Sequence, residues 1–173
     1  MADGIRGKEY LHFPDDVIKG IVLHRNIDTF TDAHATFRKS KHRLHANYGH
    51  YSGVIIDIFY DHFLAKNWSL YSDELLSNFV ANFYKSLENN LSILTDKTKQ
   101  LLPYMIQFNW LESYKTIEGI ETILTQMDKR IKNNSKMRFS IIELRQFYTE
   151  FEAEFTSFFA ELNVFAKQKI QQL

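Results

Sequence analysis

Apolar residues recur every three or four positions along almost the whole chain, and no segment alternates apolar and polar residues as a β-strand does. This spacing predicts an all-α protein, a single compact bundle of about seven helices. The expected helices cover residues 14–27, Thr29 or Thr31 to about 47, 54–67, 72 to about 90, 95 to beyond 103 with a bend or restart at Pro103, 117–131, and 139–169.

The composition bounds the class of protein. The chain has 173 residues, is 45% hydrophobic and contains no linker rich in Pro, Gly or Ser, so one domain over residues 1–173 is expected. The absence of cysteine excludes disulfides and thiolate metal sites and fits a reducing compartment, so we expect a cytoplasmic protein.

Charged residues interrupt the most apolar segment, 53–65, which argues against membrane insertion. Twenty-one basic residues balance twenty-one acidic ones, which gives no indication of nucleic-acid binding, and no feature specifies an oligomeric state.

Histidine and aspartate residues form two pairs with helical spacing in the first half of the chain. His24 lies four positions before Asp28, and Asp57 four positions before Asp61, so each pair projects from one helix face. Imidazole and carboxylate ligands without thiolate suit Mn or Fe better than Mg. The pattern predicts a divalent-metal site. An ordinary surface ion pair is the alternative for His24 and Asp28, whereas carboxylates on the apolar helix 54–67 need a cation or hydrogen-bond donors.

Two longer segments carry a specific family likeness: residues 13–34, FPDDVIKGIVLHRNIDTFTDAH, and residues 57–68, DIFYDHFLAKNW. Both resemble the signature of the bacterial acyl carrier protein phosphodiesterases. Met105, the triplets at 109–111 and 119–121, and the phenylalanine-rich stretch 147–159 are similar to the C-terminal half of that family. The resemblance covers essentially the whole chain.

This resemblance implies a helical fold related to the HD-domain phosphohydrolases. It also implies metal-dependent hydrolysis of the phosphodiester between a carrier-protein serine and 4'-phosphopantetheine, with apo carrier protein as a product. The implied metal ligands are His24, Asp28, Asp61 and His62, and the expected cofactor is Mn²⁺, with Mg²⁺ or Fe²⁺ as alternatives.

Four further residues are candidates for catalysis. Asp57 would lie beside the metal, and either Asp57 or Asp32 would orient or deprotonate the attacking water. Arg25 would clamp a phosphate oxygen, and Asp3 matches an acidic residue of the family's N-terminal Ala-Asp segment. The alternatives are a solvated surface charge for Arg25 and a helix-capping motif for Asp32.

Because carrier proteins are acidic, the protein substrate implied by the resemblance needs a basic docking face. Arg38, Lys39, Lys41 and Arg43 would form such a face on the second predicted helix, although a solvated helix surface is the alternative. A second basic cluster at 129–138 would serve the same purpose or flank a loop.

One departure bears on activity. Family members carry an additional N-terminal segment with a histidine ahead of the Ala-Asp position at which this sequence begins. We therefore expect a truncated family member, whose activity depends on whether that segment is needed. Two other functions stay open: an HD-like phosphohydrolase of a nucleotide or small phosphoester, and an inactive helical interaction protein.

Overall fold

The computed structural model describes residues 2–173, except for the side chain of Asp3. Seven long helices make up most of this part: α1 (Asp15–Ala33), α2 (Ala35–Tyr48), α3 (Ser52–Lys66), α4 (Leu76–Asn89), α5 (Asp96–Gln107), α7 (Ile117–Arg130) and α9 (Tyr148–Ile170). Two short helices, α6 (Trp110–Ser113) and α8 (Ile141–Gln146), lie between them, and residues 2–173 contain no strand. The predicted all-α fold is confirmed. No helix in this part of the chain is long and apolar enough to cross a membrane.

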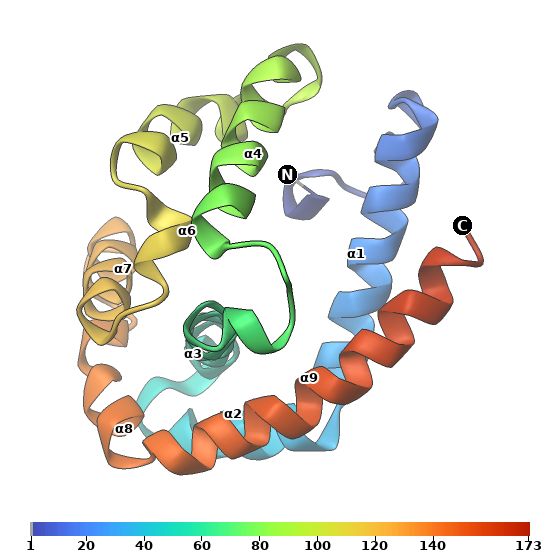
Figure 1. Ribbon diagram of the computed structural model, residues 1–173. Helices are drawn as coiled ribbons and strands as arrows, with labels where there is room; N and C mark the ends of the chain where they lie inside the picture. The colour runs from blue at the N-terminus through green and yellow to red at the C-terminus, as the bar shows by residue number, and fades with distance from the viewer. Residues whose placement is uncertain (1) are drawn as a thin grey trace.

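Helix α3 is the centre of the fold because it is apolar on most of its circumference. It packs against α2 and α9 on one side and against α7 on the other, while α9 also packs along α1 (Figure 1). Four phenylalanines form the middle of this main core: Phe59, Phe63, Phe151 and Phe155, all of them essentially inaccessible to solvent. The main core thus fixes α3 relative to α9.

A second, smaller core holds α4 and α5 together. Its buried members are Val80 and Tyr84 from α4, Leu94 before α5, and Leu102 within α5. The Tyr84 hydroxyl accepts a hydrogen bond of 3.0 Å from the backbone N–H of Leu111, which ties α4 to α6. Figure 1 shows this pair of helices at the end of the molecule away from α2 and α8.

The boundary between the first two helices differs from the prediction. Thr29 and Thr31 lie inside α1, which continues to Ala33, and the Thr29 hydroxyl donates to the Arg25 carbonyl at 2.9 Å. The cap of α2 is His34, whose Nδ1 accepts from the Thr36 N–H at 3.2 Å. The predicted start at either threonine was therefore wrong, because an imidazole provides the cap.

The last predicted helix is also divided. Residues 139–169 form the end of a short 3₁₀ turn, then α8, then α9, with Phe147 (φ −114°, ψ 32°) between the two α-helices. Helix α5, by contrast, continues through Pro103 without a restart.

Candidate functional site

Five of the predicted site residues line a single cavity of about 680 Å³ between α1, α3 and α9. Its polar walls come from α1 and α3 and contain His24, Asp28, Asp32, Asp57 and Asp61. A third wall, from α9, is apolar and contains Phe155, Phe158, Phe159 and Leu162. We refer to this space as the acidic cavity. It suits a ligand that has one charged part and one apolar part.

The α1 wall exists because α1 runs past residue 27. In an uninterrupted helix, residues 24, 28 and 32 lie on one face, one turn apart. His24 Nε2 is 3.5 Å from an Asp28 carboxylate oxygen, and both side chains are partly exposed. The extended α1 therefore brings Asp32 onto the same wall as His24 and Asp28.

The α3 wall carries two carboxylates in an apolar helix. Asp61 is exposed to solvent where it lines the cavity. Partial desolvation of its carboxylate, and then the negative charge of Asp57, raise the pKa of Asp61. Burial and the Asp61 carboxylate also raise the pKa of the neighbouring Tyr114 hydroxyl. The two aspartates repel each other, so a cation between them would lower the energy of the site.

The donor chemistry of the acidic cavity fits a divalent cation, since it combines one imidazole with carboxylates. Among residues 2–173 without the Asp3 side chain, no three histidine or acidic side chains lie close enough to hold one ion. The metal stays a prediction. The predicted role of Asp3 falls on a side chain outside the described residues.

His62 is not brought to the acidic cavity. It is buried on another face of α3, because consecutive helical residues point about 100° apart. Its Nδ1–H donates to the Tyr114 carbonyl at 2.8 Å, which leaves Nε2 to accept from the Tyr148 hydroxyl at 2.8 Å. Burial lowers the pKa of His62, consistent with a neutral ring. Both ring nitrogens are engaged in the core, so we remove His62 from the candidate metal ligands.

Arg25 does not line the acidic cavity either. Its guanidinium donates to the carbonyls of Ile5 and Gly7, each at 2.9 Å, and lies 4.8 Å from the centre of the Tyr10 ring. Figure 1 shows the N-terminal turn between α1 and α4, where these contacts hold it. Arg25 anchors the N-terminal segment on α1, which replaces the predicted role as a phosphate clamp.

Arg25→Ala is therefore expected to loosen the N-terminal segment. Losing two charge-assisted hydrogen bonds should speed amide exchange at Ile5, Glu9 and Leu11 about tenfold, measured by hydrogen–deuterium exchange. Lys19→Ala, a change at an exposed position of the same helix, is the control. Equal exchange in both variants would mean that burial of Ile5 alone holds the segment.

The basic residues of α2 separate into different environments. Arg43 makes two hydrogen bonds to the Glu154 carboxylate, at 2.7 and 2.8 Å, and lies over the Phe151 ring. Lys39 approaches the same carboxylate at 3.3 Å but is largely exposed. Arg38 is exposed and donates from Nε to the Asp32 carbonyl at 2.9 Å, whereas Lys41 is half-buried. Arg43 thus belongs to the packing of α2 on α9, and Arg38 lies beside the acidic cavity.

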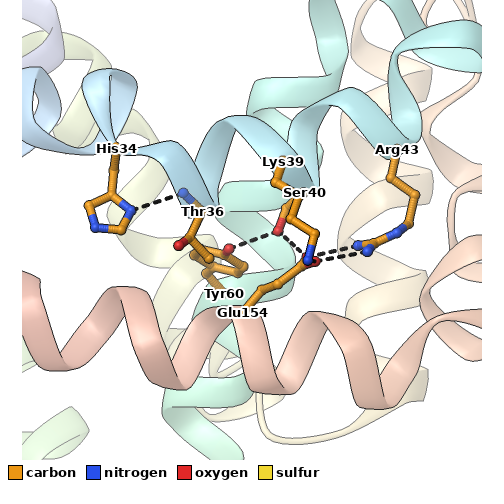
Figure 2. A network of polar contacts seen from close by, with 7 residues as sticks. All are labelled: His34, Thr36, Lys39, Ser40, Arg43, Tyr60 and Glu154. Carbon is orange, nitrogen blue, oxygen red and sulfur yellow. Dashed lines mark hydrogen bonds and ion pairs between the residues drawn. The ribbon is translucent and has the colours of Figure 1, made fainter.

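Glu154 is the centre of a polar network between three helices (Figure 2). Besides Arg43, it accepts a hydrogen bond of 2.5 Å from the Ser40 hydroxyl, which is 2.9 Å from the Tyr60 hydroxyl. Burial opposes ionisation of Glu154, but the bonds from Arg43 and Ser40 outweigh burial and hold its pKa below the usual range. Tyr60 also lines the acidic cavity, so the network braces one of its walls.

The sequence patterns did not identify the apolar wall of the cavity. Phe155, Phe158 and Phe159 were assigned to the core by their spacing, and the first two are indeed buried there. With Leu162, these residues follow the i, i+3, i+4, i+7 spacing of an ordinary core stripe. The sequence therefore carries no signal that part of this stripe lines a cavity.

Comparison with known proteins gives one consistent family. The family model for acyl carrier protein phosphodiesterase matches residues 1–162. Relatives named acyl carrier protein phosphodiesterase include one from Photorhabdus laumondii, 29% identical over 170 residues, covering 98% of this chain and 86% of the relative. Those from Pectobacterium atrosepticum and Salmonella dublin are 27% and 28% identical, over 96% and 98% of this chain and 87% and 88% of the relatives. No solved structure matches the chain, so the likeness to HD-domain folds stays a prediction.

Proposed function

The chain belongs to the acyl carrier protein phosphodiesterase family, a family of hydrolases, and we propose that it cleaves 4'-phosphopantetheine from a holo carrier protein. The products are the apo carrier protein and free 4'-phosphopantetheine. One observation carries the proposal: five residues predicted for the reaction line one cavity that is polar on α1 and α3 and apolar on α9. The substrate matches this division, because it joins a charged scissile phosphate to a largely uncharged arm.

We propose that a divalent cation, Mn²⁺ in the first instance and Mg²⁺ or Fe²⁺ otherwise, binds in the acidic cavity with ligands from among His24, Asp28, Asp57 and Asp61. Because no three of these side chains lie close enough to hold one ion in the described structure, binding requires the α1 and α3 walls to approach each other. When bound, such a cation supplies positive charge to the phosphate oxygens and lowers the pKa of a water molecule. The repulsion between Asp57 and Asp61 supports this assignment, because an adjacent cation offsets it.

The remaining carboxylate of the wall, Asp32, is assigned to proton transfer. Water attacks phosphorus while Asp32 accepts its proton, the bond between phosphorus and the serine oxygen breaks, and that oxygen leaves with the electron pair and takes up a proton. The apolar α9 wall excludes competing water from one side of the cavity. Asp3 stays a predicted contributor to the same reaction.

The test is mass spectrometry of a holo carrier protein incubated with this chain and Mn²⁺. Loss of the 4'-phosphopantetheine mass, suppressed by EDTA and restored by Mn²⁺, is the expected result. If EDTA does not suppress the loss of this mass, the phosphodiesterase activity is supported and its dependence on a metal is refuted. Cleavage of nucleotides or small phosphoesters without cleavage of the carrier protein would replace the proposed substrate with that class.

We further propose that the exposed cations of α2 dock the acidic carrier protein next to the acidic cavity. Arg38 supports this, since it is exposed and bonded to the Asp32 carbonyl of the cavity wall. Lys39 and Lys41 extend the positive charge along α2. Arg43 is left out because Glu154 neutralises it.

Arg38→Gln combined with Lys41→Gln is expected to raise KM for the carrier protein about fivefold and to weaken its dependence on salt. Both effects follow from removing two positive charges of α2 that attract an acidic partner, one on the exposed Arg38 and one on the half-buried Lys41. The control is Lys129→Gln with Lys132→Gln, which removes the same charge at the end of α7. If the control and the test variant raise KM equally, docking through α2 is refuted.

A further inference from the structure

A second cavity, of about 130 Å³, adjoins the acidic cavity between α3 and α4. The two cavities share Asp61 and Leu64 as lining residues. We call the smaller one the α3–α4 groove. Because both cavities are lined by these two residues, they adjoin the same stretch of α3, within the length of one extended ligand.

The α3–α4 groove is apolar apart from its shared end. Asp61 is the only charged residue that lines it within the described part of the chain. Trp68, Leu76 and Phe79 are among its apolar lining residues. A charged or strongly polar ligand would lose hydration there without gaining partners, whereas a neutral apolar segment would bury its surface.

The aromatic wall of the groove is held in place although it is partly exposed. The indole N–H of Trp68 donates to the Glu74 carbonyl at 2.7 Å, and the Trp68 and Phe79 rings lie 4.8 Å apart. Phe79 nevertheless keeps 40% of its surface accessible. Fixed aromatic surface that stays open to solvent is typical of a binding site rather than of a core.

We propose that the α3–α4 groove receives the pantetheine arm of the substrate, beginning with the dimethyl-branched carbon next to its phosphoester, and so determines substrate specificity. The inference rests on the proposed function. A phosphodiester has two substituents, and one of them here is a folded protein, which cannot enter a space of about 130 Å³. The narrow, uncharged arm is the substituent that can enter, with its apolar dimethyl-branched carbon inside the groove and its amides beyond it, while the carrier protein stays outside the acidic cavity.

The kinetic test compares two phosphodiesters. We expect Phe79→Ala to lower the ratio of kcat/KM for holo carrier protein to kcat/KM for bis(4-nitrophenyl) phosphate about tenfold, because the latter has no pantetheine arm. Leu76→Trp, which fills the groove instead of opening it, should lower the same ratio. The matched control is Phe83→Ala: the same residue type on the same helix, 38% exposed and outside the groove lining.

The outcomes separate the groove from the proposed function. An unchanged ratio in Phe79→Ala and Leu76→Trp, or an equal fall in Phe83→Ala, would refute the groove while the phosphodiesterase activity stands. If the wild-type chain cleaves no carrier protein at all, the proposed function fails and the groove is judged by binding alone.

Binding is measured with D-pantetheine, which has the arm but no phosphate. In a Trp110→Phe background the remaining tryptophan is Trp68, so its fluorescence reports on the groove. Saturable quenching that Phe79→Ala weakens about tenfold and Phe83→Ala preserves is expected. Absence of saturable binding in the wild-type groove, or equal binding in all variants, would overturn the inference.

Discussion

Asp61→Ala is expected to reduce carrier-protein hydrolysis about a thousandfold. Asp61 lines both the acidic cavity and the α3–α4 groove, and it lies beside Asp57 with a raised pKa. Its removal takes away a proposed cation ligand at the point where the phosphate would lie. The rate is measured as loss of the 4'-phosphopantetheine mass, and calorimetry reports Mn²⁺ affinity, which should fall with it.

His24→Ala tests the α1 wall in the same way and should reduce the rate of carrier-protein hydrolysis by a comparable factor. The controls are Asp16→Ala, an exposed aspartate in the first turn of α1, and His42→Ala, an exposed histidine on α2. All four variants should keep the helical circular dichroism spectrum, because the replaced side chains are not part of either core. Normal turnover in both Asp61→Ala and His24→Ala would place the reaction elsewhere.

Arg43→Met is expected to be the most destabilising of these substitutions, with a loss of about 3 kcal/mol in unfolding free energy and about 10 °C in melting temperature. Arg43 makes two hydrogen bonds to the Glu154 carboxylate, and that side chain is only 7% exposed. Without Arg43, Glu154 keeps a buried charge with much weaker compensation. Urea and thermal unfolding measure the loss.

Lys39→Met is the matched control for Arg43→Met, since Lys39 contacts the same carboxylate but has a side chain 70% exposed. It should cost less than about 1 kcal/mol. If both variants lose the same unfolding free energy, the burial of the Arg43–Glu154 contact does not add to its contribution to stability.

The same pair gives the protein a defined response to acid. The pKa of Glu154 lies below its ordinary value of 4.5, so its ionised form stabilises the fold fully above about pH 4.5. As pH falls through the lower pKa of the folded state, the carboxylate is protonated and that contribution is lost. Unfolding free energy measured between pH 3 and 6 should therefore fall less steeply toward acid in Arg43→Met than in the wild-type chain.

Helical periodicity identified the parts of the site that depend on local geometry. His24 with Asp28, and Asp57 with Asp61, are four residues apart, and the structure places all four on one cavity. The position of Asp32 on the same wall could be predicted only by knowing that α1 continues to Ala33. That end depends on the His34 cap, which is not among the usual capping residues.

Residue roles that depend on distant partners could not be predicted in this way. His62 belongs to the same sequence motif as Asp61. Its ring is nevertheless fixed by hydrogen bonds to Tyr114 and Tyr148, which are 52 and 86 positions away. Arg25 is held by carbonyls of Ile5 and Gly7, whose backbone groups have no signature in the sequence. Likewise, nothing local in α2 indicates that Arg43 pairs with Glu154 from the other end of the chain.

The two separate cores also bear on how such a protein can diversify. Asp57 and Asp61 extend from a helix of the main core, whereas Phe79 belongs to a helix that packs in the smaller core of α4 and α5. Substitutions within the smaller core can therefore shift Phe79 without moving the carboxylates. Substitutions on the α4 side of the groove can thus alter the proposed substrate specificity while the carboxylates of α3 keep their places.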